Sequence, residues 1–189
     1  QRGYELNAAL LKRQRGGNYL PVAGIIYRPG DDTLVWNDGS GKNHFIRNGG
    51  LIDIKDTRDG GIRGWVRAVD SSRKLTEFYG SLGEKLNVSS EAIPSGGIGA
   101  SIVDLIEGKI NLLVYNYNLT REWDWAMALP MLKSVGGFVC DLDGKDITNF
   151  NRKPDNKKSE YDLRGVVASI SFKKDDIIKN IPEYLIEDR

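Results

Sequence analysis

The segment Glu122-Trp123-Asp124-Trp125-Ala126-Met127-Ala128 is followed, twelve residues after Asp124, by Gly136-Gly137 and then by Phe138-Val139-Cys140-Asp141. This order predicts an acidic side chain at the start of a helix, a glycine break and a short apolar strand. A helix N-terminus favours anions, and a carboxylate beside it can hold a cation, so Asp124 is a candidate metal ligand next to a phosphate position. An isolated Asp before a helix is more often a simple N-cap, so Asp124 alone does not distinguish a metal ligand from an N-cap, and the other motifs of the chain are needed.

The first third of the chain has the alternation and turn residues of an antiparallel sheet. The expected strands cover Leu6–Leu11, Leu20–Tyr27, Thr33–Trp36, His44–Ile46 and Leu51–Ile54. From Trp65 on, apolar strands alternate with amphipathic helices, which predicts a sheet covered by helices. The expected helices cover Lys74–Leu86, Ala100–Glu107, Trp125–Val135 with a bend at Pro130, and Asp175–Ile186 with a bend at Pro182. We therefore interpret residues 1–64 and 65–189 as two parts of one domain, each with its own sheet.

The composition is that of an ordinary globular domain. The chain has 189 residues, 40% hydrophobic content and a net charge of +1, which gives no electrostatic argument for a nucleic acid polymer or a membrane as partner. No apolar run approaches the roughly 20 residues of a membrane span, and we expect a cytoplasmic protein. The single cysteine, Cys140, excludes an internal disulfide and is expected in the core. His44, the only histidine, is expected at the surface.

The motifs together resemble the inositol monophosphatase superfamily over nearly the whole chain. Residues 123–127 and 136–141 are similar to its W-D-x-A-A and G-G-x-v-x-D signature, with Met127 in place of the second alanine. Residues 21–29 are similar to its p-v-x-G-v-i-y-x-P strand, and residues 95–100 to its Gly-Ser/Thr loop at a helix start. The resemblance implies an α/β (α+β) class protein with the layered α-β-α-β-α sugar-phosphatase fold.

The resemblance also implies a function, the Mg²⁺-dependent hydrolysis of a small phosphorylated metabolite. Asp124 matches a metal ligand of the family. The expected substrate-binding positions are Gly96, Gly97, Gly99, Ala100, Tyr117 and Arg73, and either Gly96-Gly97 or Gly99-Ala100 stands for the family's glycine pair. The substrate branch stays open between inositol phosphates and 3'(2'),5'-bisphosphate nucleotides. Two alternatives are a non-catalytic phosphate-binding or assembly subunit and a plain structural domain.

Two acidic motifs of the family, G-E-E and D-P-x-D-G-T, are not found in this sequence. Tyr4–Leu11 is similar to the strand that follows the second motif, so we expect an N-terminally truncated chain with most metal ligands upstream. Without the family's N-terminal helices, one face of the antiparallel sheet should be exposed. Exposed apolar area of that size predicts a homodimer or pairing with the missing segment.

Overall fold

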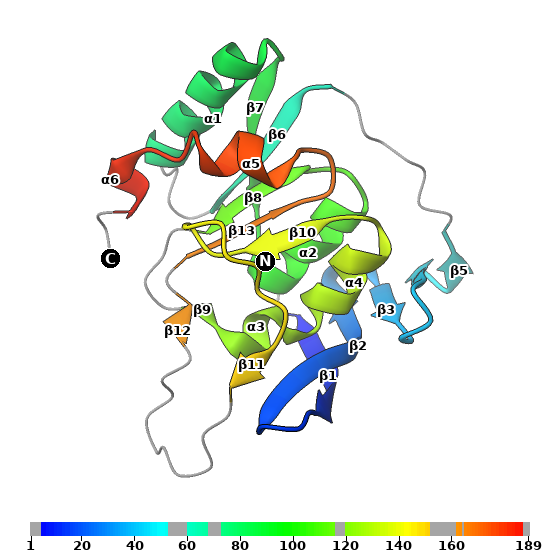
Figure 1. Ribbon diagram of the computed structural model, residues 1–189. Helices are drawn as coiled ribbons and strands as arrows, with labels where there is room; N and C mark the ends of the chain where they lie inside the picture. Colours follow the sequence, from blue (N-terminus) through cyan, green and yellow to red (C-terminus); the bar gives the residue numbers. More distant parts are fainter. Residues whose placement is uncertain are drawn as a thin grey trace.

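The computed structural model describes residues 5–52, 60–67, 73–115, 120–151, 162–163 and 165–186. The first part forms the predicted antiparallel sheet, with strand order β1-β2-β3-β4-β5 (Figure 1). Its strands are β1 (Leu6–Arg13), β2 (Asn18–Arg28), β3 (Thr33–Asn37), β4 (Asn43–Arg47) and β5 (Gly50–Leu51). A later strand, β11 (Phe150–Asn151), pairs with the start of β2. Between β2 and β3 the chain turns through a short 3-10 helix, Pro29–Asp31.

A second, mixed sheet has the order β10-β13-β8-β6-β7. These strands are β6 (Ile62–Arg67), β7 (Ser90–Ser95), β8 (Leu112–Tyr115), β10 (Phe138–Cys140) and β13 (Val166–Ser169). Strand β6 runs parallel to both β7 and β8, whereas β13 is antiparallel to its two neighbours. A separate pair joins β9 (Thr120–Arg121) to β12 (Asp162–Leu163).

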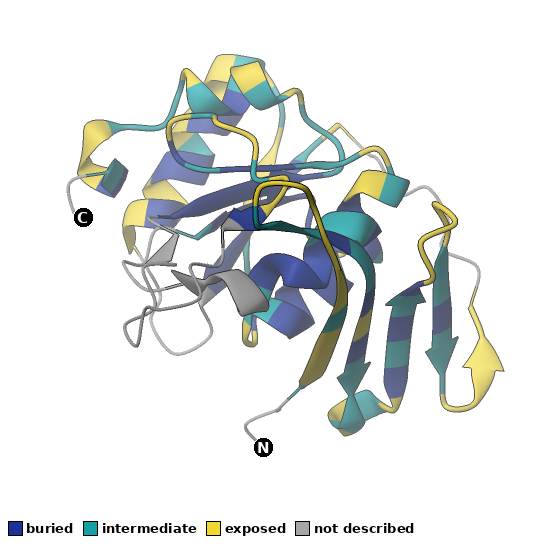
Figure 2. Cartoon of the chain, turned by 60° about the horizontal axis from the view of Figure 1, so that its bottom comes forward, coloured by how far each residue is buried: buried dark blue, intermediate teal, exposed yellow. Residues whose placement is uncertain are grey.

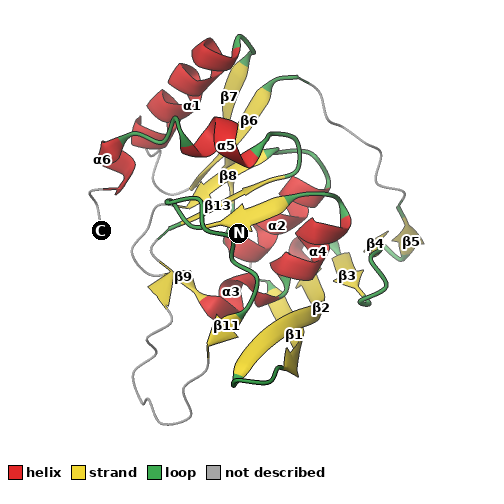
Figure 3. Cartoon of the chain, in the orientation of Figure 1, coloured by secondary structure: helices red, strands yellow, loops and turns green. Residues whose placement is uncertain are grey.

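Helices and sheets alternate in layers (Figures 1 and 3). Helices α2 (Ile98–Ile106) and α4 (Ala128–Ser134) contact strands of both sheets, so they form a middle layer together with α3 (Glu122–Ala126), which packs against β1. Helix α1 (Arg73–Leu86) covers β6 and β7 from the other side and contacts α6 (Glu183–Ile186). The described residues thus form a helix–sheet–helix–sheet order, and none of their helices lies on the far face of the antiparallel sheet.

Two of the predicted helices are each divided into two shorter helices in the structure. The predicted helix Trp125–Val135 is broken at Met127 into α3 and α4, and Pro130 falls in the first turn of α4. A proline is tolerated there because the first turn of a helix has no intrahelical acceptor for its missing N–H. The predicted terminal helix is likewise two helices, α5 (Lys174–Ile178) and α6, with Pro182 directly before α6. Tight turns after α5, such as the bond from Ile181 N–H to the Ile178 carbonyl, end that helix.

The core lies between the two sheets and beneath α1. Trp125 and Met127 are buried in it, as is Cys140, which confirms the core position predicted for the cysteine. Gly24 of β2 meets the backbone at Met127 so closely that a Cβ at residue 24 would lie 2.4 Å from the Met127 carbonyl oxygen. Two of the quoted motifs therefore touch one another at the junction of α3 and α4. Among the described residues, no helix is both long and apolar enough to span a membrane.

Candidate functional site

Four predicted substrate positions follow the carboxyl ends of three neighbouring parallel strands. Arg67 of β6 pairs in register with Ser95 of β7, and Gly64 of β6 pairs with Leu112 of β8, so the three strands end at one edge of the mixed sheet. Arg73 comes after β6, Gly96-Gly97 after β7, and position 117 after β8. Ligands of open α/β sheets bind outside the carboxyl ends of the strands, which makes this edge the candidate site. Tyr117 itself lies outside the described residues.

The glycine loop after β7 leads into the N-terminus of α2, as predicted. Gly97 is the N-cap residue and supplies no side chain to cap the helix. Instead the carboxylate of Glu5 lies there: a Cβ at Gly97 would be 3.1 Å from one of its oxygens, and the Ala100 amide donates to it. Burial raises the pKa of Glu5, while the Ala100 amide and the nearby Arg28 charge oppose that rise. The N-terminus of α2 therefore already holds the carboxyl group of Glu5, the residue directly before β1.

Gly99 is in contact with β1 through Asn7. A Cβ at this position would lie 2.7 Å from the Asn7 side-chain oxygen, so only glycine lets β1 approach α2 this closely. Glu5 and Asn7 were not among the predicted site residues. Both lie in the segment Tyr4–Leu11, which was quoted only as a strand, and their places beside α2 come from the pairing of β1 with β2, which local sequence does not show.

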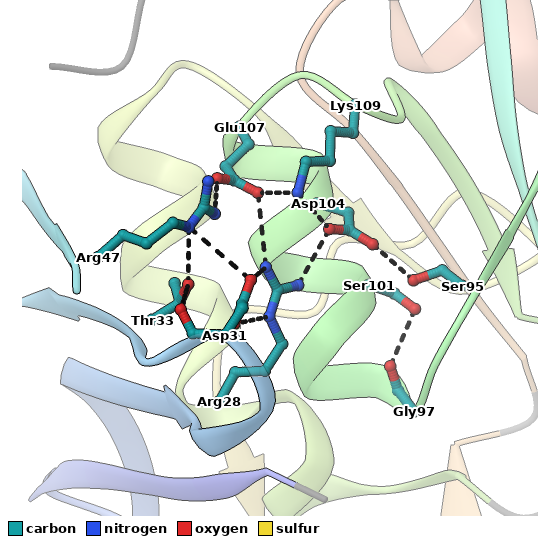
Figure 4. A network of polar contacts seen from close by, with 10 residues as sticks. All are labelled: Arg28, Asp31, Thr33, Arg47, Ser95, Gly97, Ser101, Asp104, Glu107 and Lys109. Carbon is teal, nitrogen blue, oxygen red and sulfur yellow. Dashed lines mark hydrogen bonds and ion pairs between the residues drawn. The ribbon is translucent and has the colours of Figure 1, made fainter. Parts of the chain in front are cut away.

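A network of charged side chains joins β2, β4 and α2 behind this loop (Figure 4). The Arg28 guanidinium donates to Asp31 at 2.6 Å and to Asp104 at 3.1 Å, and Ser95 donates to the other Asp104 oxygen at 2.7 Å. The hydrogen bond from Arg28 lowers the pKa of Asp31. Burial works against the charge of Arg28, but its bonds to the two carboxylates outweigh burial and raise the pKa of Arg28.

The same network continues through Glu107, which pairs with Arg47 of β4 and with Lys109. Every charge in the network that Figure 4 draws faces an opposite charge, which is the arrangement expected where charged groups are taken out of water. Arg28 lies inside a motif quoted from the sequence, but nothing local indicated that its partner would be Asp104. We assign the network to the attachment of the antiparallel sheet to α2.

Asp124 lies in the first turn of α3 and is half-buried. Helix α3 packs against both β1 and α2, so the predicted metal ligand lies on a helix in contact with the helix that follows the glycine loop. Arg73 begins α1, but its side chain is 90% exposed and pairs with Glu77 at 2.7 Å. That pairing is the arrangement of a solvated surface arginine.

The described residues do not complete a magnesium site. No group of three or more His, Cys, Asp or Glu side chains among them is placed to hold a metal ion. Mg²⁺ prefers octahedral oxygen coordination through one or two carboxylates, substrate oxygens and water. Asp124 offers one such carboxylate, and no group of three or more such side chains forms among the described residues, so we derive no reaction step through a metal.

A separate cleft of about 650 Å³ lies between the antiparallel sheet and the α4–β10 segment. Pro21, Asn37, Leu129, Lys133 and Ile147 are among its lining residues. None of the predicted site residues lines it, so it is distinct from the candidate site.

Comparison with known proteins supports the motif-based interpretation. No protein-family model matches the chain. It is 27% identical over 175 residues to 3'(2'),5'-bisphosphate nucleotidase 1 of Dictyostelium discoideum, and 22% identical over 167 residues to inositol monophosphatase 3 of Danio rerio. These matches cover 85% and 86% of this chain but only 53% and 44% of the relatives, so the chain spans about half the length of the curated proteins it matches.

The solved structures agree on the fold. CysQ from Bacteroides thetaiotaomicron, described as a bacterial member of the inositol monophosphatase family, matches with a TM-score of 0.61 and 18% identity, over 89% of this chain and 71% of that one. The protein PH1897 from Pyrococcus horikoshii matches with a TM-score of 0.58 and 18% identity, over 87% and 61% of the two chains. The predicted resemblance is confirmed: this is a mixed α/β chain of the inositol monophosphatase superfamily fold, related in sequence to its phosphatases.

Proposed function

We propose that this chain forms part of a cytoplasmic Mg²⁺-dependent phosphatase that hydrolyses a small phosphate monoester. The observation that carries the proposal is the meeting of three features at one place. The glycine loop at Gly96–Gly99 and the helix that bears Asp124 both lie against β1, next to the edge where β6, β7 and β8 end. The two relatives that match in sequence are named as a bisphosphate nucleotidase and an inositol monophosphatase.

The chain's own residues have distinct roles in this proposal. The amides at the start of α2 orient the substrate phosphate, because a helix N-terminus favours an anion. Asp124 is one metal ligand, and further ligands come from outside the described residues. Magnesium would supply Lewis acidity and a water of lowered pKa. Glu5 must leave the α2 N-terminus before a phosphate can take its place.

The substrate class rests on the comparisons rather than on a specificity pocket. The higher identity is to a bisphosphate nucleotidase, 27% against 22% for the inositol monophosphatase. We therefore propose a 3'(2'),5'-bisphosphate nucleotide as the first substrate to test and an inositol phosphate as the second.

A second candidate function is a non-catalytic phosphate-binding or assembly subunit. The observation that favours it is the lack of a three-acid cluster among the described residues. Such a subunit would use the α2 N-terminus to bind phosphate without Asp124 having a catalytic role.

The test measures phosphate release from adenosine 3',5'-bisphosphate and from inositol 1-phosphate, with and without Mg²⁺, for the unmodified chain and the Asp124→Asn variant. Magnesium-dependent release that disappears in Asp124→Asn would support the phosphatase and identify its branch. Phosphate binding by calorimetry without turnover, equal in both proteins, would support the binding subunit. A chain that shows no turnover and no phosphate binding would reject both functions.

A further inference from the structure

The cleft between the antiparallel sheet and the α4–β10 segment has apolar walls. Its volume of about 650 Å³ falls within the range of small-molecule sites, roughly 300–1,000 Å³. Strand β2, helix α4, strand β10 and the segment after β10 supply its apolar side chains, which include Leu20, Pro21, Val22, Leu129, Phe138 and Ile147. All of these except Pro21 are half-buried, so the cleft keeps apolar surface that a ligand can cover.

Hydrogen bonds hold the two walls of the cleft in place. The Asn43 side-chain amide of β4 donates to the Met131 carbonyl of α4 at 2.9 Å, which ties the β3–β4 hairpin to the helix. Asn37 lines the cleft, is 3% exposed, and donates to the Lys42 carbonyl and to Asn43 at 3.0 Å. Figure 2 shows the strands of this sheet with alternating buried and partly exposed positions, beside the buried helices of the middle layer. The cleft is therefore built between packed elements, on the side of the sheet that faces α4.

The charged side chains of the cleft leave one cation without a counter-charge. Lys133, in the last turn of α4, and Asp146, after β10, both line the cleft. Asp146 is paired with Lys174 at 2.8 Å, which offsets its negative charge. Lys133 is exposed, and no ion pair between described residues includes it. The cleft thus combines apolar walls with one unpaired positive charge.

Several other polar groups of the cleft are already bonded within the protein. The Ser134 hydroxyl donates to the Met131 carbonyl at 2.7 Å, and the Gly137 amide donates to the Leu132 carbonyl at 2.9 Å. The side-chain oxygen of Asn37 accepts a hydrogen bond from the Gly39 amide. A neutral polar ligand gains nothing from these groups, whereas an anion gains the charge of Lys133.

We propose that this cleft binds a small amphipathic anion, a molecule with an aromatic or aliphatic body and one negatively charged group. The body packs against the apolar walls, since burial of apolar surface drives such association. The charged group lies near Lys133. Because the cleft is separate from Asp124 and the glycine loop, this proposal does not rest on the proposed phosphatase function.

The test is a fluorescence titration of the chain with two dyes that share the same rings. Anilinonaphthalene sulfonate carries one negative charge, and N-phenylnaphthylamine carries none. Lys133→Gln should weaken binding of the sulfonate by about threefold at low salt, the size expected for an exposed charge pair, and should leave binding of the neutral dye unchanged. Lys85→Gln is the matched control, because Lys85 is also an exposed lysine in the last turn of a helix, α1, and does not line the cleft. It should change the binding of neither dye.

Leu129→Glu tests the apolar wall. Leu129 is half-buried in the first turn of α4, where an acidic side chain favours a helix, so the variant should keep its fold. The new carboxylate removes apolar contact and repels an anion, and we expect the affinity for the sulfonate to fall at least about tenfold.

Affinity for the sulfonate that falls in Lys133→Gln and Leu129→Glu but not in Lys85→Gln, with unchanged circular dichroism, would support the proposal. A chain that does not bind the sulfonate would overturn it. Equal binding by the unmodified chain and Lys133→Gln would also overturn it, because the dye would then bind another apolar surface. If Leu129→Glu fails to fold, the comparison of Lys133→Gln with Lys85→Gln still decides, because both changes are at exposed side chains.

Discussion

Replacing Gly24 by alanine tests the contact that joins the two sheets through the α3–α4 junction. A Cβ at this position would lie 2.4 Å from the Met127 carbonyl oxygen, 2.8 Å from its Cα and 2.9 Å from its carbonyl carbon. All three atoms belong to the backbone, so no side-chain rotation relieves the overlap. Overpacking costs typically about 1–3 kcal/mol, and we expect the upper end here, about 3 kcal/mol. Alanine recovers about 0.5–1 kcal/mol of backbone entropy, which leaves a net loss of about 2 kcal/mol.

For a chain of this length, a loss of about 2 kcal/mol lowers the Tm by about 4–8 °C. Urea unfolding of Gly24→Ala would measure the loss in the free energy of unfolding, and calorimetry would measure the fall in Tm. Gly80→Ala is the matched control: residue 80 lies inside α1, nothing lies within 4 Å of its added Cβ, and alanine should stabilise the helix by about 0.5–1 kcal/mol. Gly24→Ala as stable as the unmodified chain would refute the packing of β2 on the α3–α4 junction.

Three further predictions concern charge and the thiol. Because the pKa of Glu5 is raised above its ordinary value of 4.5, its contribution to stability is full below that value and is lost as the pH rises through the folded pKa. Glu5→Gln should therefore flatten the pH dependence of urea unfolding above pH 4.5, and an unchanged profile would contradict this. Arg28→Met removes the cation closest to Asp104 and should lower the free energy of unfolding, measured in urea, by about 2–3 kcal/mol. The loss should be smaller than for a fully buried ion pair, because Lys109 lies 3.5 Å from Asp104 and still faces it. The exposed control variant, Arg73→Met, should leave the midpoint of urea unfolding unchanged. Burial raises the pKa of Cys140 to about 12, so a thiol reagent at neutral pH should label the unfolded chain and not the native one; rapid native labelling would show that β10 opens.

Much of this protein could be predicted from its sequence because the decisive signals are local. Alternating apolar residues and turn residues predicted the antiparallel sheet, amphipathic spacing predicted α1, and the glycine loop predicted the start of α2. The Gly-Gly motif correctly placed Cys140 in a buried strand, whereas Asp124, predicted just before a helix that starts at Trp125, lies inside α3, which starts at Glu122. The roles of Asp124 and of the glycine loop in catalysis stay predictions.

Contacts between distant segments were decided only by the tertiary structure. Arg28 and Asp104 are 76 positions apart, and their pairing requires β2 to pass over α2. The position of Glu5 at the α2 N-terminus depends in the same way on which strands pair and on their register. A residue's own neighbours fix its backbone preference and the side of the strand on which it lies. Which surface it then meets depends on long-range packing, which no local pattern encodes.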